Sequence, residues 1–273
     1  MQEGLIDEVL RQLMSGKEAV VFVVRSGSEI LCAKVYKEAN RRGFKQAALY
    51  QEGRKVKNSR QARAMEKKTR YGREAQEEAW QNVEVDTLYR LSGAGVRVPK
   101  PFGFFKGVVI MELVVDAAGH AAPRLNDITL GESEALEYHD FLVRQIVRML
   151  SAGIIHGDLS EYNVLLGADG PVIIDLPQAV DAAANNNAEA MLLRDVENMR
   201  NYFSRFAPAL AATRYGPEIW KLYQGGILEP DSPLTGRFES SRKKANVGAV
   251  IDEISAVKLE HEALLDYKAR RTQ

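Results

Sequence analysis

The sequence has almost none of the features that mark extracellular or membrane-spanning proteins. Cys32 is the one cysteine among 273 residues, so no internal disulfide can form, and a reducing compartment is expected. The longest apolar run, near residues 108–115, is too short to span a bilayer, and the first residues lack the apolar stretch of a signal peptide. These absences predict a cytoplasmic protein without a membrane partner.

An excess of charge of either sign is also absent. Lys plus Arg and Asp plus Glu number 37 each, so the net charge indicates neither a nucleic-acid nor a membrane partner. The positive residues are unevenly distributed, however, because residues 37–73 contain thirteen Lys and Arg but only three Glu. Such a stretch is typical either of a solvated, flexible loop with some helix or of a patch that binds polyanions. Both interpretations remain open.

Runs rich in β-branched and other apolar residues predict strands in the first third of the chain. Two antiparallel hairpins are expected, one over residues 19–36 that turns at Ser26-Gly27-Ser28 and one over residues 102–114 that turns at Lys106-Gly107. Helices are expected over the amphipathic residues 1–13 and over residues 74–91. A sheet accompanied by a helix therefore dominates this part of the sequence.

Helical spacing dominates the remainder. Thr129-Leu130-Gly131-Glu132 has the form of a capping box, and it predicts the start of a helix that Gly153 ends. Short strands are expected at residues 164–166 and 172–175. Beyond Asp181 the chain is expected to be helical, with a Gly/Pro-rich interruption at residues 225–236 and an amphipathic helix over residues 247–270.

The two halves together predict an α+β fold of two lobes, joined near residues 112–116. Residues 1–114 form an N-lobe of antiparallel sheet plus helix, which includes the basic flexible loop at about 38–73. Residues 115–273 form a mainly helical C-lobe.

The strongest chemical signal is the segment His156-Gly157-Asp158-Leu159-Ser160-Glu161-Tyr162-Asn163, followed by Ile173-Ile174-Asp175. A carboxylate at Asp158 can orient an attacking hydroxyl or water and accept its proton, while an amide oxygen at Asn163 ligates Mg²⁺. Asp175 adds a second carboxylate to the oxygen ligands that Mg²⁺ prefers. This pattern predicts phosphoryl transfer, a reaction in which positioning and charge neutralisation supply most of the rate.

Phosphoryl transfer also requires a cation for the phosphates of the nucleotide. Lys34 lies on the second strand of the first hairpin, and Glu84 on the following helix is its natural ion-pair partner. A solvated lysine at the tip of an edge strand is the alternative interpretation. The loop before the first strand, Ser15-Gly16-Lys17-Glu18-Ala19, matches neither glycine-rich phosphate-binding motif, which argues against a P-loop NTPase.

Together these residues resemble the RIO kinases, an atypical protein-kinase family without the usual glycine-rich loop and activation segment. The resemblance covers residues 5–203 and includes the S-G-K-E-A loop, the A-K-V-Y-K strand, Trp80 four residues before Glu84, the H-G-D-L-S-E-Y-N-V-L segment, and Arg194-Asp195 with Asn198.

This resemblance implies a protein-kinase-like fold and a serine/threonine protein kinase or ATPase that uses ATP with Mg²⁺ or Mn²⁺. It implies that Asp158 is the catalytic residue, that Asn163 and Asp175 bind the metal, and that the nucleotide contacts are Ser15, Lys17, Lys34, Glu84, Met111, Glu112 and Val114. Glu112 to Val114 would be the hinge that binds adenine, and Met111 would lie at the back of the pocket. The acceptor would be an unidentified protein or the chain itself, with autophosphorylation expected in the basic loop.

Three departures from ordinary kinases restrict the inferences about the substrate. Ser160 replaces the lysine two residues after the aspartate, and Leu-Pro-Gln rather than Phe-Gly follows Asp175. Tyr215-Gly216-Pro217-Glu218 imitates the A-P-E motif but follows Asp195, which is the wrong order. Two alternatives stay open: a small-molecule kinase similar to aminoglycoside and choline phosphotransferases, and a nucleotide-binding scaffold on a ribosomal RNA–protein particle reached through the basic loop.

Overall fold

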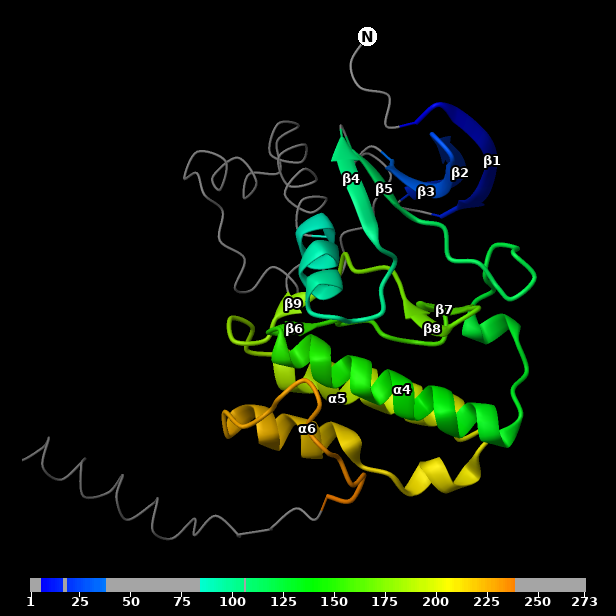
Figure 1. Cartoon of the computed structure of the whole chain (residues 1–273). Helices are drawn as coiled ribbons and strands as arrows, with labels where there is room; N and C mark the ends of the chain where they lie inside the picture. Colours follow the sequence, from blue (N-terminus) through cyan, green and yellow to red (C-terminus); the bar gives the residue numbers. More distant parts are fainter. Residues whose placement is uncertain (1–5, 17–18, 38–83, 106, 239–273) are drawn as a thin grey trace, which may run out of the picture. The chain divides into compact units, whose positions relative to one another are not determined.

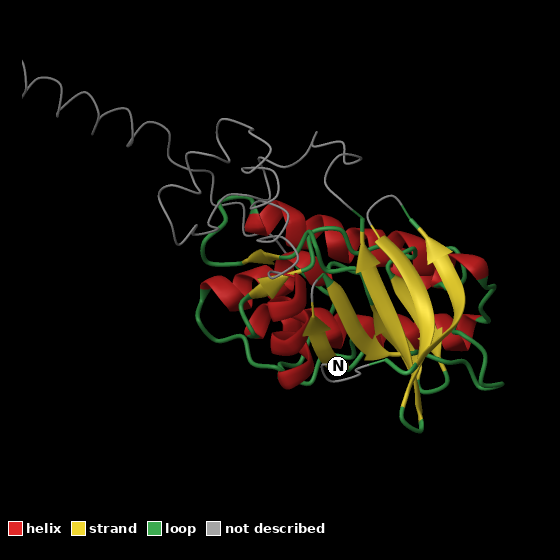
Figure 2. Ribbon diagram, turned by 90° about the horizontal axis from the view of Figure 1, so that it is seen from above, coloured by secondary structure: helices red, strands yellow, loops and turns green. Residues whose placement is uncertain are grey.

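Five strands form one antiparallel sheet in the order β1-β2-β3-β5-β4 (Figures 1 and 2). They are β1 (Glu8–Ser15), β2 (Ala19–Ser26), β3 (Glu29–Tyr36), β4 (Pro101–Phe105) and β5 (Val108–Glu112). The structure, a computed structural model, describes residues 6–16, 19–37, 84–105 and 107–238. Both expected hairpins are present, with Val23 paired to Cys32 in the first and Phe104 paired to Val109 in the second.

The prediction of a helix at the start of the chain is wrong. Residues Glu8–Ser15 form the edge strand β1, which pairs antiparallel with β2 and has bulges near Arg11 and Met14. Apolar residues at positions 9, 10, 13 and 14 fit helical spacing, but almost every residue of β1 is exposed. Hydrogen bonding to the open edge of β2, which the local sequence does not encode, decides the conformation.

A helix over residues 84–93 precedes β4, and its apolar residues Val85, Leu88 and Leu91 are buried in the main core. Its start, predicted at residue 74, lies outside the described residues. Gly95, with a φ of 74°, ends the turn that follows.

Three longer helices follow the sheet: α4 (Glu132–Ser151), α5 (Ala188–Phe203) and α6 (Tyr215–Gln224). The single turns η2 (Leu125–Asp127) and η3 (Pro208–Ala212) precede α4 and α6. Helix α5 packs against both α4 and α6, as Figure 1 shows. Their shared core includes Leu142 and Met149 of α4, Met199 and Phe203 of α5, and Ile219 of α6.

The capping box of α4 lies two residues later than predicted. Gly131 is the N-cap, and its N–H donates to Glu134 Oε2 at 2.9 Å. Thr129 lies two residues before that N-cap and therefore outside the helix. Gly153, with a φ of 75°, follows the helix at the predicted place.

Two short pairs of strands lie between α4 and α5. β6 (Ile154–Ile155) pairs with β9 (Val180–Asp181), and β7 (Val164–Gly167) pairs with β8 (Gly170–Ile173). The prediction that this last strand extends to Asp175 is wrong. β8 ends at Ile173, and Asp175 has a left-handed backbone with a φ of 66°.

The predicted α+β class, an antiparallel sheet followed by a mainly helical part, is confirmed for the described residues. Within them, no helix combines the length and apolar character that crossing a bilayer requires. The basic stretch at 38–73 and the amphipathic helix predicted over residues 247–270 lie outside the described residues. The lobe boundary at residue 114 stays a prediction.

Candidate active site

One buried cation lies between two carboxylates from distant parts of the chain. Lys34 on β3 places its Nζ 2.6 Å from Glu84 Oε1 and 3.1 Å from Asp175 Oδ1. The side chains of Lys34 and Glu84 are 13% and 10% exposed, whereas that of Asp175 is 49% exposed. The expected ion pair between Lys34 and Glu84 is therefore present, and Asp175 joins it on the solvent side.

These charges stabilise one another. Burial lowers the pKa of Lys34, but the carboxylates of Glu84 and Asp175 outweigh burial and raise it above its ordinary value. Burial raises the pKa of Asp175, but the Lys34 ammonium outweighs burial and holds it below its ordinary value. The site thus presents a charged ammonium, which binds phosphate oxygens, beside a charged carboxylate, which binds hard cations.

Tyr36 completes the surroundings of Glu84, a contact that no motif in the sequence indicates. Its hydroxyl donates to Glu84 Oε2 at 2.5 Å, and Lys34 Nζ lies 5.5 Å from the centroid of its ring. Both carboxylate oxygens of Glu84 therefore have a donor, which compensates the burial of their charge. Alternation along β3 places Tyr36 on the same sheet face as Lys34, but it does not reveal the contact.

The loop between β6 and β7 carries Asp158 and Asn163. His156 and Leu159 are buried and anchor this loop, whereas Asp158 between them is exposed. Asn163 Nδ2 donates to the backbone oxygen of Asp158 at 2.8 Å, which fixes the orientation of the amide. Burial raises the pKa of Asp158 above its ordinary value, although His156 and Arg194 oppose the shift. A raised pKa makes the carboxylate a better proton acceptor.

Helix α5 holds the backbone of this loop. The buried Asp195 accepts hydrogen bonds from Gly157 N at 2.8 Å and from Leu159 N at 3.1 Å. Asn198 Nδ2 donates to Leu159 O at 2.9 Å, and Arg194 donates to Gly157 O. Burial raises the pKa of Asp195 to about 6. The family resemblance singled out these three α5 residues, and they contact the backbone on both sides of the exposed aspartate.

Asn163 and Asp175 flank the β7–β8 hairpin at its open end. Ile174 N donates to Asn163 O at 2.9 Å, and Asp175 follows directly. Their side chains offer an amide oxygen and a carboxylate, which suit Mg²⁺. No group of three or more His, Cys, Asp and Glu with metal-binding geometry occurs among the described residues. Two protein ligands fit Mg²⁺ because this ion usually completes its shell with water and phosphate.

The turn between β1 and β2 is held by a lysine from the end of β3. Lys37 Nζ donates to Ser15 Oγ at 3.0 Å and to Gly16 O at 2.6 Å. Gly16 N donates to Ala19 O at 2.9 Å, which closes the turn. Lys17 lies outside the described residues, so the phosphate contacts of Ser15 and Lys17 stay predictions.

Met111 and Glu112 are the last two residues of β5, and Val114 lies two residues beyond it. Met111 pairs with Cys32 and therefore shares a sheet face with Lys34. The carboxylate of Glu112 binds Arg97 in a bidentate pair at 2.6 and 2.8 Å. Because this side chain is engaged, an adenine contact at Glu112 would have to use its backbone.

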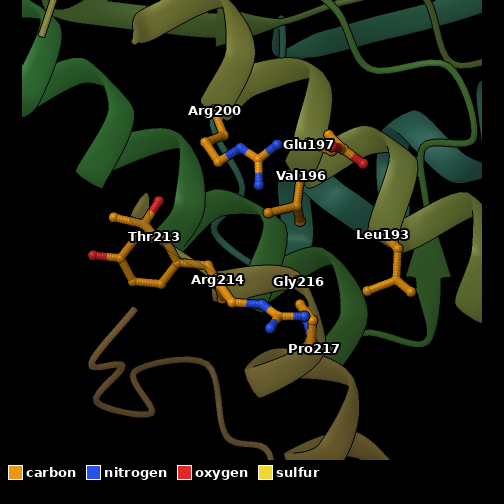
Figure 3. A pocket seen from close by; sticks show the side chains of 9 residues that line it. Leu193, Val196, Glu197, Arg200, Thr213, Arg214, Gly216 and Pro217 are labelled. Atoms are coloured by element: carbon orange, nitrogen blue, oxygen red, sulfur yellow. Dashed lines mark hydrogen bonds and ion pairs between the residues drawn. The ribbon is translucent and has the colours of Figure 1, made fainter. Parts of the chain in front are cut away.

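A separate cavity of about 250 Å³ lies beside α5 and the start of α6 (Figure 3). Its lining comprises Leu193, Val196, Glu197, Arg200, Thr213, Arg214, Tyr215, Gly216 and Pro217. No predicted site residue lines it. The imitation of the A-P-E motif begins at Tyr215, so this tetrapeptide forms the first turn of α6.

The sequence comparisons with known proteins all match one family. A model of the RIO domain family matches residues 20–215. The RIO-type serine/threonine-protein kinase Rio1 of Haloferax volcanii is 36% identical over 207 residues, which cover 75% of this chain and 66% of that protein. Rio1 of Methanocaldococcus jannaschii is 32% identical over 201 residues, which cover 73% and 64%.

The solved structure of a kinase domain is also similar, with a TM-score of 0.47 and 14% identity over 74% of this chain and 65% of that one. The chain spans slightly less than two thirds of the length of the Haloferax and Methanocaldococcus relatives.

Proposed function

The chain belongs to the RIO domain family, and from that premise we propose that it transfers the γ-phosphate of ATP to serine or threonine hydroxyls of a protein or of itself. The observation that carries this proposal is the contact of Lys34 with both Glu84 and Asp175. A cation that can bind phosphate oxygens and a carboxylate that can bind their counter-ion meet there. Asp158 is exposed, and its pKa is raised by burial and, less strongly, by the charge of Asp175.

In this proposal the residues of the sheet bind the nucleotide. Lys34 neutralises the α- and β-phosphates, and Glu84 with Tyr36 fixes the ammonium. Ser15 and Lys17 lie near the phosphates, Met111 lies behind the base, and the backbone of Glu112 and Val114 binds adenine. Lys34 acts in the ground state, so it contributes mainly to nucleotide affinity.

Asn163 and Asp175 would hold Mg²⁺, with Mn²⁺ as a substitute, through one amide oxygen and one carboxylate. When bound, the metal neutralises the charge of the phosphates. Burial raises the pKa of Asp175, but the Lys34 ammonium outweighs burial and lowers the pKa below its ordinary value. This ligand is therefore ionised at neutral pH. An ionised carboxylate is the form that binds a divalent cation.

Asp158 acts as the general base for the acceptor hydroxyl. Its carboxylate accepts the proton of the serine or threonine hydroxyl while the hydroxyl oxygen forms a bond to the γ-phosphorus. The bond between that phosphorus and the β–γ bridging oxygen breaks, and ADP leaves. Water in place of the hydroxyl gives ATP hydrolysis, so a switch-like ATPase uses the same residues. Contact with a ribosomal particle through the basic loop stays an expectation from the sequence, since that stretch lies outside the described residues.

The test uses γ-labelled ATP with the protein alone, with a generic protein substrate and with amino sugars. We expect label on protein, whereas label on the sugars would favour the small-molecule alternative. Asp175→Ala should abolish turnover and weaken metal-dependent nucleotide binding. Asp169→Ala is the matched control, because this exposed aspartate lies in the β7–β8 turn and is expected to leave both quantities unchanged. Normal turnover in Asp175→Ala would refute the metal assignment.

A further inference from the structure

Gln178, for which the sequence indicates no role, contacts the proposed catalytic aspartate. Its Nε2 lies 3.3 Å from Asp158 Oδ2. Gln178 is the third residue after Asp175, in the stretch where this chain departs from the Phe-Gly of ordinary kinases.

The backbone around Gln178 is fixed. Leu176, Pro177 and Ala179 are buried, and Ala179 N donates to Leu176 O at 3.0 Å in a tight turn. Val180, the next residue, pairs with Ile155 in the β6–β9 ladder. The Gln178 amide is therefore presented to Asp158 from a rigid support, which a positioning role requires.

The orientation of this amide is energetically costly. Gln178 Oε1 is buried and has no hydrogen-bond partner among the described residues. A buried acceptor without a partner loses the hydrogen bonds it would make to water, so native proteins rarely retain one without compensation. The opposite orientation would place Oε1 against the Asp158 carboxylate, and two acceptors would then repel each other. The observed orientation therefore keeps the hydrogen bond from Gln178 Nε2 to Asp158 and leaves Gln178 Oε1 without a partner among the described residues.

We infer that Gln178 is a positioning residue for phosphoryl transfer: it holds one carboxylate oxygen of Asp158 so that the other faces the acceptor hydroxyl. This inference rests on the proposed function, because it requires Asp158 to be catalytic. It assigns Gln178 no contact with the nucleotide.

A positioning role and a merely structural role predict different results for Gln178→Met, which keeps the length of the side chain and removes both polar atoms. Loss of the donor frees the Asp158 side chain, and misplacement of a reacting group by about 1 Å costs on the order of 10²-fold in rate. Removal of the unpaired Oε1 leaves the melting temperature unchanged or higher. We therefore expect a kcat that is about 10- to 100-fold lower, with unchanged nucleotide Kd and no loss of stability.

The experiment measures kcat, the Kd of MgADP and the melting temperature for the full chain and for four variants. Gln178→Met and Gln178→Glu test the contact, Asp158→Asn tests the premise, and Gln224→Met is a matched control at the exposed end of α6. Gln178→Glu keeps the shape and places a carboxylate against Asp158, so its kcat should fall as well.

Normal kcat in either Gln178 variant, with Asp158→Asn impaired, would overturn this inference and leave the proposed function intact. A Gln178→Met protein that fails to fold, or whose kcat loss accompanies a lower melting temperature, would also overturn it in favour of a structural role. Normal kcat in Asp158→Asn would instead contradict the proposed function itself.

Discussion

At the scale of single residues, the site depends on buried charges that have fixed partners. The charges of Lys34 and Glu84 form an ion pair, and the carboxylate of Asp195 accepts hydrogen bonds from two backbone N–H groups. Removal of one member of such a set leaves the other uncompensated, which costs more than the set contributes. We therefore expect large effects from substitutions that change few atoms.

Asp195→Asn is the first such substitution. An amide offers one acceptor oxygen, so Gly157 N or Leu159 N would face an NH₂ group instead of a carboxylate oxygen. We expect kcat to fall about tenfold or more, since one hydrogen bond to a charged group is worth about 1.5–3 kcal/mol, with little change in nucleotide Kd.

Asp181→Asn is the control for the removal of a carboxylate charge. Asp181 also accepts two backbone N–H groups, from Ala183 at 3.0 Å and Ala184 at 3.1 Å, but both bond to its Oδ1, its side chain is exposed, and it lies outside the loop that carries Asp158. Equal kcat values for Asp195→Asn, Asp181→Asn and the unmodified protein would show that α5 does not position the loop.

At this scale the sequence identifies residues whose chemical type and spacing are diagnostic. Asp158, Asn163 and Asp175 are predicted as site residues in this way, because the pattern H-x-D-x₄-N followed by I-I-D is hard to meet by accident. Tyr36 and Gln178 could not be found, since their contacts depend on strand register and on a turn rather than on a motif.

At the scale of elements, the hairpins and α4 follow from local pattern, whereas β1 does not. β2 and β3 are mostly apolar runs on either side of the turn at Gly27, which predicts strands, but the apolar residues of β1 fit both a helix and an edge strand. The true cap of α4 is Gly131, whose N–H bonds to Glu134, and a glycine gives no side-chain signal of that role.

The packing of α4 on α5 and α6 includes a buried histidine. His139 is 1% exposed, its ring lies 5.7 Å from those of Phe203 and Tyr215, and its Nε2 has no partner among the described residues. Burial lowers its pKa from 6.5 to about 4, although Asp140 opposes the shift. Because the folded pKa is the lower one, His139 takes up a proton on unfolding between these values. Its contribution to stability is present above pH 6.5 and is lost as the pH falls toward 4.

His139→Leu should remove the loss of stability that His139 causes as the pH falls from 6.5 toward 4. We expect a melting temperature close to that of the unmodified protein at pH 7 and higher than it at pH 5, measured by calorimetry. The shift of pKa corresponds to at most about 3 kcal/mol below pH 4. His120→Leu, at a side chain that is 82% exposed, is the control and should not alter the pH dependence. The same pH dependence in His139→Leu would contradict this account of the helical core.

At the scale of the whole molecule, the site joins residues far apart in sequence. Lys34 and Asp175 are separated by 141 positions, yet they form a direct ion pair. The sequence predicted both residues through their separate motifs, but no local pattern states that an ammonium and a carboxylate at this separation meet. Long-range contact of this kind is what the fold adds to the motifs.

The basic stretch provides a further prediction for the chain as a whole. Ser59 and Thr69 are the serine and threonine residues between Arg41 and Arg73, and autophosphorylation is expected there. Mass spectrometry after incubation with MgATP should locate phosphate on one or both, and the Asp158→Asn protein should remain unmodified. Phosphate only outside this stretch, or none in the unmodified protein, would count against self-modification in the basic loop.

The central claim, that Asp158 acts in the transition state while Lys34 anchors the nucleotide, has one direct test. Turnover and nucleotide Kd are measured side by side for Asp158→Asn and Lys34→Ala. We predict that Asp158→Asn lowers kcat by roughly 10²–10⁴-fold with an almost unchanged Kd, and that Lys34→Ala weakens nucleotide binding. Normal turnover in Asp158→Asn, or weak ATP binding as its one defect, would contradict the account.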